Sequence, residues 1–280
     1  MPSASLSDRS FIHIGGADAQ SFLHNLITTD VNGLPAGEAR PGALLTPQGK
    51  ILFDFLIWRT GEGFTLECQS GIADVLLKRL TMYKLRAAVS LSATTGSVRL
   101  IWGEEADSAQ GILDAAFAKA GLRVLRQPEP EAPDSREAYD SLRIQAGLAT
   151  APKDYALQDA FPHDVLMDLN GGLSFRKGCY VGQEVVSRMQ HRGTARRRVV
   201  QIKSDHPLPE TGTELTAGGK PIGHLGTVVG NRALAIVRID RAGDAMANAV
   251  PILAGEVVVS LTLPGWTGLS FPTNADGADA

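Results

Sequence analysis

Hydrophobic residues recur with two different spacings along the first half of the chain. Apolar residues at every second position predict strands, and apolar residues three or four positions apart predict helices with one buried face. The predicted strands cover residues 11–14, 42–46, 50–59, 64–68, 88–91, 97–102 and 122–125, and the predicted helices cover residues 18–27, 71–86 and 108–120. Pro47 and Gly49, between two of these strands, are typical of a tight turn. The first half therefore mixes helices and strands.

Helix start and stop signals continue beyond this half. Residues 127–133 contain three prolines and two glutamates, which predict an exposed connector. Asp134 followed by Glu137 is typical of a capping box, and it predicts a helix that ends at Gly147. Two more helices are predicted, one at residues 161–169 and one that follows a turn and ends near residue 189.

The pattern changes near Arg198. Short runs of aliphatic and β-branched residues follow, separated by turns that contain glycine, and they lie at residues 199–202, 220–222, 225–229, 233–237 and 257–263. Short strands at such close spacing are typical of a small antiparallel barrel or sandwich. The polar residues after Pro264 predict a frayed tail.

Composition limits the class of protein. The chain has 280 residues, of which 44% are hydrophobic and 20% charged, and its net charge is −3. These values are typical of a globular protein with a sizeable core. We expect no signal peptide and no membrane span, because no suitable apolar run is present. Two distant cysteines, Cys68 and Cys179, predict neither a disulfide framework nor a structural zinc site, and they favour a reducing cytosol.

One carboxylate interrupts an apolar strand. Asp54 lies between two phenylalanines, and burial of a carboxylate is costly unless it has a partner. Alternation would place it on a wet face beside Leu52 and Leu56, but these neighbours are apolar. We therefore favour a position on the wall of a pocket. Cys68, which alternates with apolar residues, is most simply a small buried hydrophobe.

Reactive side chains collect in residues 175–184. Glycines flank Cys179, and Lys177 and Arg176 precede it. If a helix begins near Cys179, its free N–H groups and the two cations favour the thiolate and lower the pKa of the thiol. The alternative is a packed cysteine at a helix start, but the Gly-Gln-Glu sequence that follows is not typical of a core.

Positive charge surrounds this stretch. Residues 174–203 hold eight lysines and arginines and a single acid, Glu184, which gives a local net charge of +7. This favours a site for a polyanion, either nucleic acid or a polyglutamate tail, unless acids elsewhere pair with the cations. Aromatic residues do not alternate with the cations, so we expect no direct nucleic-acid binding.

Metal ligands are sparse in the sequence. The six histidines show no paired spacing, and Cys179 alone cannot hold an iron–sulfur cluster, which typically takes four thiolates. We predict no metal site of the chain's own. A cluster could be contacted only transiently or shared with another chain.

Residues 177–184, Lys-Gly-Cys-Tyr-Val-Gly-Gln-Glu, resemble a family signature. The signature KGCYxGQE is typical of YgfZ-type folate-binding proteins, which are related to the glycine cleavage T-protein and include mitochondrial iron–sulfur assembly factors. The resemblance extends over most of the chain, and it includes residues 18–23, 28–31, 49–54 and 142–147.

The resemblance implies an α+β fold. A two-lobed, T-protein-like folate-binding body would span residues 1–195, a small C-terminal antiparallel β-barrel residues 196–265, and a disordered tail residues 266–280. Tetrahydrofolate, or a one-carbon derivative, would occupy a central hole. Lys177 and Cys179 would be the catalytic residues beside it. The implied cofactor-binding residues are Asp54, Arg143, Lys177, Tyr180, Gln183 and Glu184.

The implied function is support for the assembly or repair of iron–sulfur enzymes, including radical enzymes that modify tRNA. Folate and these client enzymes would be the partners, and the location would be the bacterial cytoplasm, away from membranes. The alternative is a folate-dependent aminomethyltransferase or demethylase, in which Asp54 orients or deprotonates an amine. A module that binds RNA or protein through the basic residues is a third possibility.

Two departures from the T-protein pattern bear on this choice. T-proteins have a pair of aspartates where this chain has Phe53-Asp54, and an arginine where it has Tyr139. Both changes argue against glycine-cleavage chemistry. Whether the protein is an enzyme stays open, and the differences predict altered contacts to the pterin.

Overall fold

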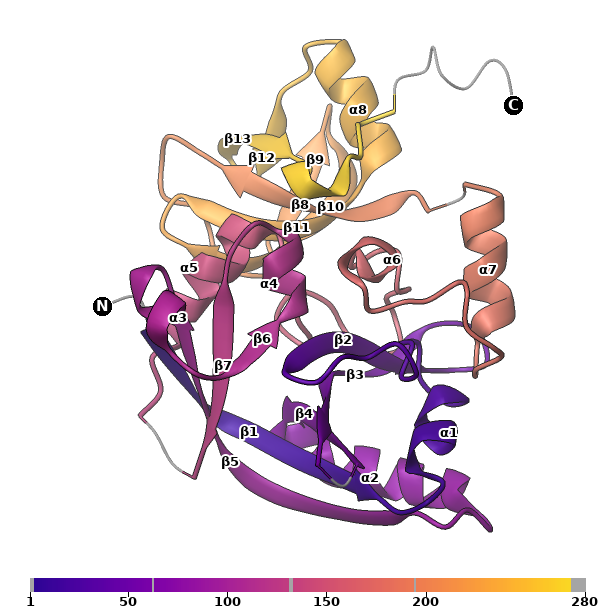
Figure 1. The fold of residues 1–280 in the computed structure, drawn as a ribbon. Coiled ribbons are helices and arrows are strands. Elements are labelled where there is room, and N and C mark those ends of the chain that lie inside the picture. The colour runs from indigo at the N-terminus through magenta and orange to yellow at the C-terminus, as the bar shows by residue number, and fades with distance from the viewer. Residues whose placement is uncertain (1–2, 62, 131–132, 194, 273–280) are drawn as a thin grey trace.

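Two closed barrels make up the computed structural model of this chain (Figure 1). The structure describes residues 3–61, 63–130, 133–193 and 195–272. The larger barrel has the strand order β1 (Ser3–Gly15), β4 (Gly63–Gln69), β3 (Ile51–Thr60), β2 (Glu38–Leu45), β6 (Ile112–Asp114), β7 (Val124–Glu129) and β5 (Ser90–Trp102). All neighbours in it are antiparallel except β2 and β6, which are parallel.

Alternation along β3 shows how the sequence builds this barrel. Phe53, Phe55 and Ile57 are buried, whereas the intervening Leu52, Asp54 and Leu56 are only half-buried. Successive side chains of a strand point to opposite faces, so Asp54 faces away from the phenylalanines on either side of it.

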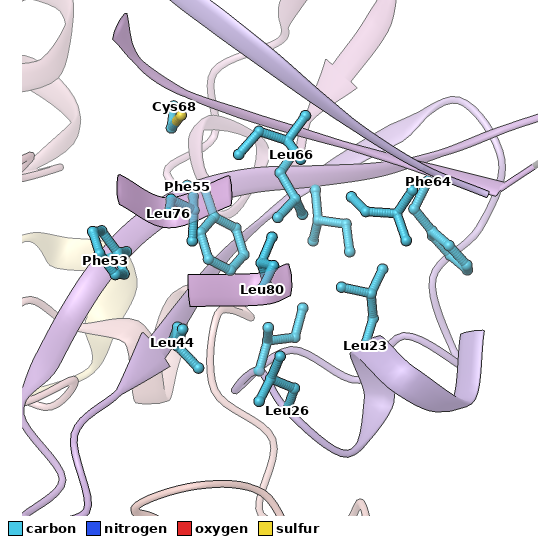
Figure 2. Packing of buried hydrophobic residues seen from close by; sticks show 14 of the residues in the cluster. Leu23, Leu26, Leu44, Phe53, Phe55, Phe64, Leu66, Cys68, Leu76 and Leu80 are labelled. Atoms are coloured by element: carbon cyan, nitrogen blue, oxygen red, sulfur yellow. The ribbon is translucent and has the colours of Figure 1, made fainter. Parts of the chain in front are cut away.

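Helices close one side of the larger barrel. The helices that precede the C-terminal barrel are α1 (Ala19–His24), α2 (Ser70–Lys84), α3 (Glu104–Ser108), α4 (Ala115–Lys119), α5 (Arg136–Ala146), α6 (Met167–Asn170) and α7 (Gln183–His191). Leu76 and Leu80 of α2 pack with Leu23 and Leu66 in one apolar cluster, shown in Figure 2. Burial of such side chains stabilises the fold by roughly 1.5–3 kcal/mol each.

The predicted helix at residues 108–120 is wrong. This segment instead contains the end of α3, strand β6 and the short helix α4. Gly111 lies against β7, where an added Cβ would be 3.1 Å from the Arg126 carbonyl oxygen, and Leu113 pairs with Leu125. Leu113 also pairs with Glu38 of the distant strand β2, so pairing within the sheet overrides the local helical spacing.

Three further expectations need correction. The connector predicted at 127–133 begins inside β7, and the two strands predicted at 88–91 and 97–102 form the single strand β5. The capping box is absent, because Ser135 is the N-cap residue of α5 and makes no side-chain capping bond. Gly147 ends α5 as predicted, in the left-handed conformation at φ 72°.

The predicted C-terminal antiparallel barrel is confirmed. Its strand order is β10 (Lys220–Val229), β11 (Arg232–Arg238), β8 (Arg197–Lys203), β13 (Val257–Thr262), β12 (Ile252–Ala254) and β9 (Glu214–Ala217). Helix α8 (Ile239–Ala247) packs against it through Ala242 and Ala245, which share the barrel's apolar core. The barrel lies above the larger body in Figure 1.

The segment that follows β13 returns to the body. A 3₁₀ helix, η1 (Gly265–Thr267), places Trp266 so that its Nε1 donates to the Ala146 carbonyl oxygen at 2.8 Å. The first part of the tail expected at residues 266–280 is therefore packed, and residues 273–280 lie outside the described part. None of the described helices is long and apolar enough to cross a membrane.

Candidate functional site

A cavity of about 110 Å³ lies at the centre of the larger body. A single buried water needs roughly 10–15 Å³ on this measure, so the cavity has room for a small ring system. Its polar and charged wall is formed by Arg9, Asp54, Glu67, Gln69, Asp114, Arg126, Arg143, Thr150 and Asn170. Its apolar wall includes Phe55, Leu148 and Met167.

Asp54 enters the cavity from β3 with two hydrogen-bond donors on one oxygen. The Tyr155 hydroxyl donates to Oδ2 at 2.7 Å, and the Ala151 N–H lies 3.4 Å from the same atom. Burial raises the pKa of the Asp54 carboxyl and raises the pKa of Tyr155 well above its ordinary value. Asp54 can therefore act as either an acceptor or a proton carrier toward a group in the cavity.

Arg143 also lines the cavity, but most of its donors are taken by the protein. Its two Nη atoms donate to the Leu148 carbonyl oxygen at 3.0 Å, Asp154 at 2.6 Å, Asp140 at 2.7 Å and Thr227 Oγ1 at 2.7 Å. Thr227 belongs to β10, and its N–H donates to Asp154 at 2.7 Å. Arg143 thus joins the body to the C-terminal barrel and has only Nε left for a ligand.

Sequence reasoning missed a second charged network in the cavity wall. Arg126 donates to both oxygens of Glu67 and, at 3.0 Å, to Asp114. All three are nearly inaccessible to solvent. Residues 64–68 of β4 are buried on both faces, so the alternation that would place Glu67 in solvent does not hold. The sequence did contain a sign of this network, because Glu67, like Asp54, is a carboxylate inside an otherwise apolar strand.

The family signature does not reach the cavity. Among the described residues that line it, none belongs to 175–184. Helix α7 spans Gln183–His191, so the predicted turn that leads into a helix is confirmed, but the helix does not begin near Cys179. Cys179 lies in the preceding loop and is exposed. Its position before the helix means that the helix N–H groups cannot act on the thiol in the way that the sequence suggested.

Lys177 points into the protein. Its Nζ donates to the carbonyl oxygens of Ile27 at 2.6 Å and Thr29 at 3.0 Å, and lies 5.1 Å from the centre of the Tyr180 ring. Burial lowers the pKa of Lys177 to about 8, against a smaller opposite effect of Asp30. The lysine therefore joins the signature to the segment before β2 rather than standing free beside the thiol.

The remaining signature residues differ in exposure. Tyr180 is buried, and its hydroxyl has no hydrogen-bond partner among the described residues. Gln183 is half-buried, and Glu184 is exposed and pairs with Arg188 at 2.7 Å. Of the predicted cofactor-binding residues, the structure brings only Asp54 and Arg143 together at the cavity.

Gly182 is expected to be structurally required. It has φ 79°, and an added Cβ would lie 2.5 Å from the Thr46 carbonyl oxygen. We expect Gly182→Ala to lower the free energy of unfolding by about 2 kcal/mol or more, because the left-handed conformation alone costs about 1–2 kcal/mol. Urea denaturation measures this change.

The matched control is Gly178→Ala, four residues earlier in the same loop. No heavy atom lies within 4 Å of a Cβ placed there. We expect a change below about 0.5 kcal/mol, as for ordinary surface positions. Equal losses at both positions would contradict the close approach of Gly182 to Thr46.

The basic residues are partly neutralised. Arg198 pairs with Asp168 at 2.8 Å, Arg197 pairs with Asp159 at 3.2 Å, and Arg188 pairs with Glu184. With Lys177 bound to backbone carbonyls, four cations make no ion pair with another described residue: Arg176, Arg192, Arg196 and Lys203. Acids elsewhere in the chain thus account for part of the local +7. The described residues hold no group of three or more metal-ligating side chains.

Comparison with known proteins agrees with the signature. A profile of the CAF17 C-terminal beta-barrel domain matches residues 196–269. The chain is 28% identical to the mouse protein called iron-sulfur cluster assembly factor IBA57, mitochondrial, over 96% of this chain and 85% of that protein. The human protein of the same name is also 28% identical, over 93% and 84%. The chain is thus similar to IBA57/CAF17 (YgfZ-type) proteins over nearly its whole length.

The fold of this chain is that of a T-protein. The crystal structure of glycine cleavage system aminomethyltransferase T from Bartonella henselae matches with a TM-score of 0.71 and covers 94% of this chain and 85% of its own. The two sequences are 18% identical, so this likeness shows the fold alone. The predicted T-protein-like α+β architecture is confirmed.

The cavity residues fit the pterin end of folate. A pterin ring has N–H donors, oxygen and nitrogen acceptors, and flat apolar faces. Asp54 can accept from N–H groups, and Phe55, Leu148 and Met167 can contact the ring faces. Arg9 and Arg143 each contain a buried Nε without a hydrogen-bond partner in the described part of the chain. Such groups favour a ligand that carries acceptors.

Proposed function

We propose that this protein binds tetrahydrofolate, or a one-carbon derivative of it, and supports the assembly or repair of iron–sulfur enzymes. Likeness to IBA57 proteins along nearly the whole chain supports the second part. The cavity supports the first, since Asp54 and an apolar wall face it together. We expect the cytoplasm as the location, where thiols stay reduced.

The observation that carries this proposal is the exposure of Cys179. The other cysteine, Cys68, is buried in the apolar core, and burial raises its pKa to about 12. Cys179 is exposed between segments that are fixed by Lys177 and Gly182. A thiol held in this way can meet a second protein or its cluster, whereas a core thiol cannot.

In this proposal the cavity binds folate, and the loop that contains Cys179 meets the iron–sulfur protein. Folate supplies a carrier for a one-carbon unit when it is bound. Asp54, which accepts a hydrogen bond from Tyr155, accepts hydrogen bonds from the pterin N–H groups or exchanges a proton with them. The apolar wall keeps water away from the pterin. Lys177 fixes residues 27–29, and the Thr29 hydroxyl donates at 2.7 Å to the carbonyl oxygen of Pro41 in the cavity wall. This chain of contacts joins the two regions.

We expect Cys179→Ser to abolish the support of iron–sulfur enzymes. In a strain that lacks the gene, the activity of [4Fe–4S] enzymes should fall, and wild-type protein should restore it. The serine variant should leave activity at the level of the empty vector. Because Cys179 is exposed, its replacement should leave the thermal unfolding midpoint nearly unchanged. Normal cluster-enzyme activity in the deletion strain, or full rescue by Cys179→Ser, would contradict the proposal.

A second candidate function is one-carbon transfer from an amine, and the position of Asp54 in the cavity favours it. The raised pKa of the Asp54 carboxyl suits a group that exchanges protons. Incubation with tetrahydrofolate and a panel of aminomethyl thioethers, whose carbon is already at the oxidation level of formaldehyde, should then yield methylenetetrahydrofolate with release of ammonia and the free thiol, and Asp54→Asn should abolish the product. Absence of product across the panel would remove this candidate.

A further inference from the structure

Arg9 is a buried cation whose side chain makes no hydrogen bond with a described residue. It lies on β1, lines the central cavity and is 7% exposed. None of its nitrogens makes a hydrogen bond with a described residue, and its buried Nε lies 3.6 Å from Glu67 and 3.7 Å from Asp8. Buried guanidinium donors are ordinarily satisfied, because a buried donor without a partner is costly.

The neighbouring carboxylates explain why Arg9 stays unsatisfied. Arg126 takes both oxygens of Glu67, one through Nε at 2.9 Å and the other through Nη2. Glu67 balances part of the charge of Arg9, but both of its carboxylate oxygens accept hydrogen bonds from Arg126. Of the three buried arginines that line this cavity, Arg126 and Arg143 donate to the protein through both Nη atoms, and Arg9 does not.

Arg9 stands close to Asp54 in the barrel. Strands β1, β4 and β3 are consecutive neighbours, and Arg9 pairs in register with Gln69, another residue of the cavity wall. The charge of Arg9 acts to lower the pKa of the Asp54 carboxyl, against the larger effect of burial. A donor and a carboxyl therefore face one cavity from adjacent parts of its wall.

We propose that Arg9 forms a subsite in the central cavity for an oxygen atom of the bound ligand. This inference rests on the proposed binding of folate. The guanidinium donates to a ligand oxygen while Asp54 takes the ligand's N–H groups, so the cavity discriminates by its pattern of donors and acceptors. At the pterin end of folate, which the cavity fits, two oxygens have this chemistry: the ring carbonyl, present in every folate, and the formyl oxygen, present only in formyl forms.

Calorimetry with three folates tests the subsite. Wild type, Arg9→Met and Arg9→Lys are each titrated with tetrahydrofolate, 5-methyltetrahydrofolate and 5-formyltetrahydrofolate. We expect Arg9→Met to bind about 10- to 100-fold more weakly, as for loss of a hydrogen bond to a charged group, and Arg9→Lys to lose less because it keeps a charged donor. Arg99→Met, which removes a half-exposed arginine of β5 outside the cavity wall, is the matched control and should bind like wild type.

The outcomes separate the two proposals. An equal loss for all three folates identifies the ring carbonyl, and a loss confined to the formyl form identifies the formyl oxygen. Either result supports the subsite. Binding by wild type that the Arg9 variants leave unchanged overturns the subsite and leaves the proposed function standing. If wild type binds none of the three, folate binding itself fails and the subsite with it. Should Arg9→Met not fold, Arg9→Lys and Arg9→Gln carry the same comparison.

Discussion

Replacement of Arg143 by methionine is expected to lower the free energy of unfolding by about 3–5 kcal/mol. The guanidinium is almost wholly buried and donates to Asp140, Asp154 and Thr227. Methionine fills a similar space but leaves the Asp154 carboxylate buried with two backbone N–H donors and no cation. The cost of that uncompensated charge exceeds what the gain of an apolar side chain can offset.

Urea denaturation of Arg143→Met and of Arg188→Ala measures this effect against a surface pair. Arg188 and Glu184 form an exposed ion pair one helical turn apart, and such pairs contribute about 0.3–0.5 kcal/mol. Because Thr227 lies in the C-terminal barrel, we also expect earlier protease cleavage at the junction of body and barrel. A loss below about 1 kcal/mol at Arg143 would contradict the buried network.

The role of Arg143 shows where sequence reasoning stops. The resemblance to YgfZ-type proteins implies that Arg143 binds the cofactor, whereas the structure shows that most of its donors are taken by the protein. Two of its partners, Asp154 and Thr227, are 11 and 84 positions away. Helix α5 itself and its glycine stop depend on local spacing and were predictable, whereas the partners of a buried charge depend on the closed fold.

The same limit explains the residues that were missed. Strand alternation located Asp54 correctly on the face opposite Phe53 and Phe55, because β3 has one strongly buried face. It could not locate Arg9 and Glu67, since their strands are buried on both faces where the barrel encloses the cavity. In a closed barrel, polar side chains that point inward line the enclosed cavity. The strand order decides which of these side chains lie next to one another.

The signature has a more structural role than its chemistry suggested. Lys177 and Tyr180 are buried, and Gly182 approaches the Thr46 carbonyl oxygen. Only Cys179 and Glu184 among its side chains are exposed. We infer that most of the signature holds the loop against the body so that one thiol is presented at a fixed place. The lysine, expected beside the thiol as a catalytic group, donates to the carbonyl oxygens of Ile27 and Thr29 and so holds that loop against the body.

The contribution of Lys177 to the free energy of unfolding is expected to increase as the pH rises. Burial lowers its pKa in the folded protein from 10.5 to about 8. Between these values the unfolded chain binds a proton that the folded protein does not, so the free energy of unfolding rises with pH across that window. Relative to Lys177→Met, wild type should gain about 3 kcal/mol from below pH 8 to above pH 10.5, with most of the gain reached by pH 10.

Denaturation curves of wild type and Lys177→Met at intervals from pH 7 to pH 10 test this prediction. The difference between the two proteins removes the titration of groups that they share, including Tyr180, whose pKa is raised by burial. Lys78→Met, at an exposed position on α2, is the reference for loss of a surface lysine. A difference that stays flat from pH 7 to pH 10 would mean that the Lys177 ammonium is solvated, and that the tie to Ile27 and Thr29 does not persist in solution. A rising difference would establish Lys177 as a buried cation that fixes the loop of Cys179, since a lysine free to serve the thiol would keep its ordinary affinity for a proton.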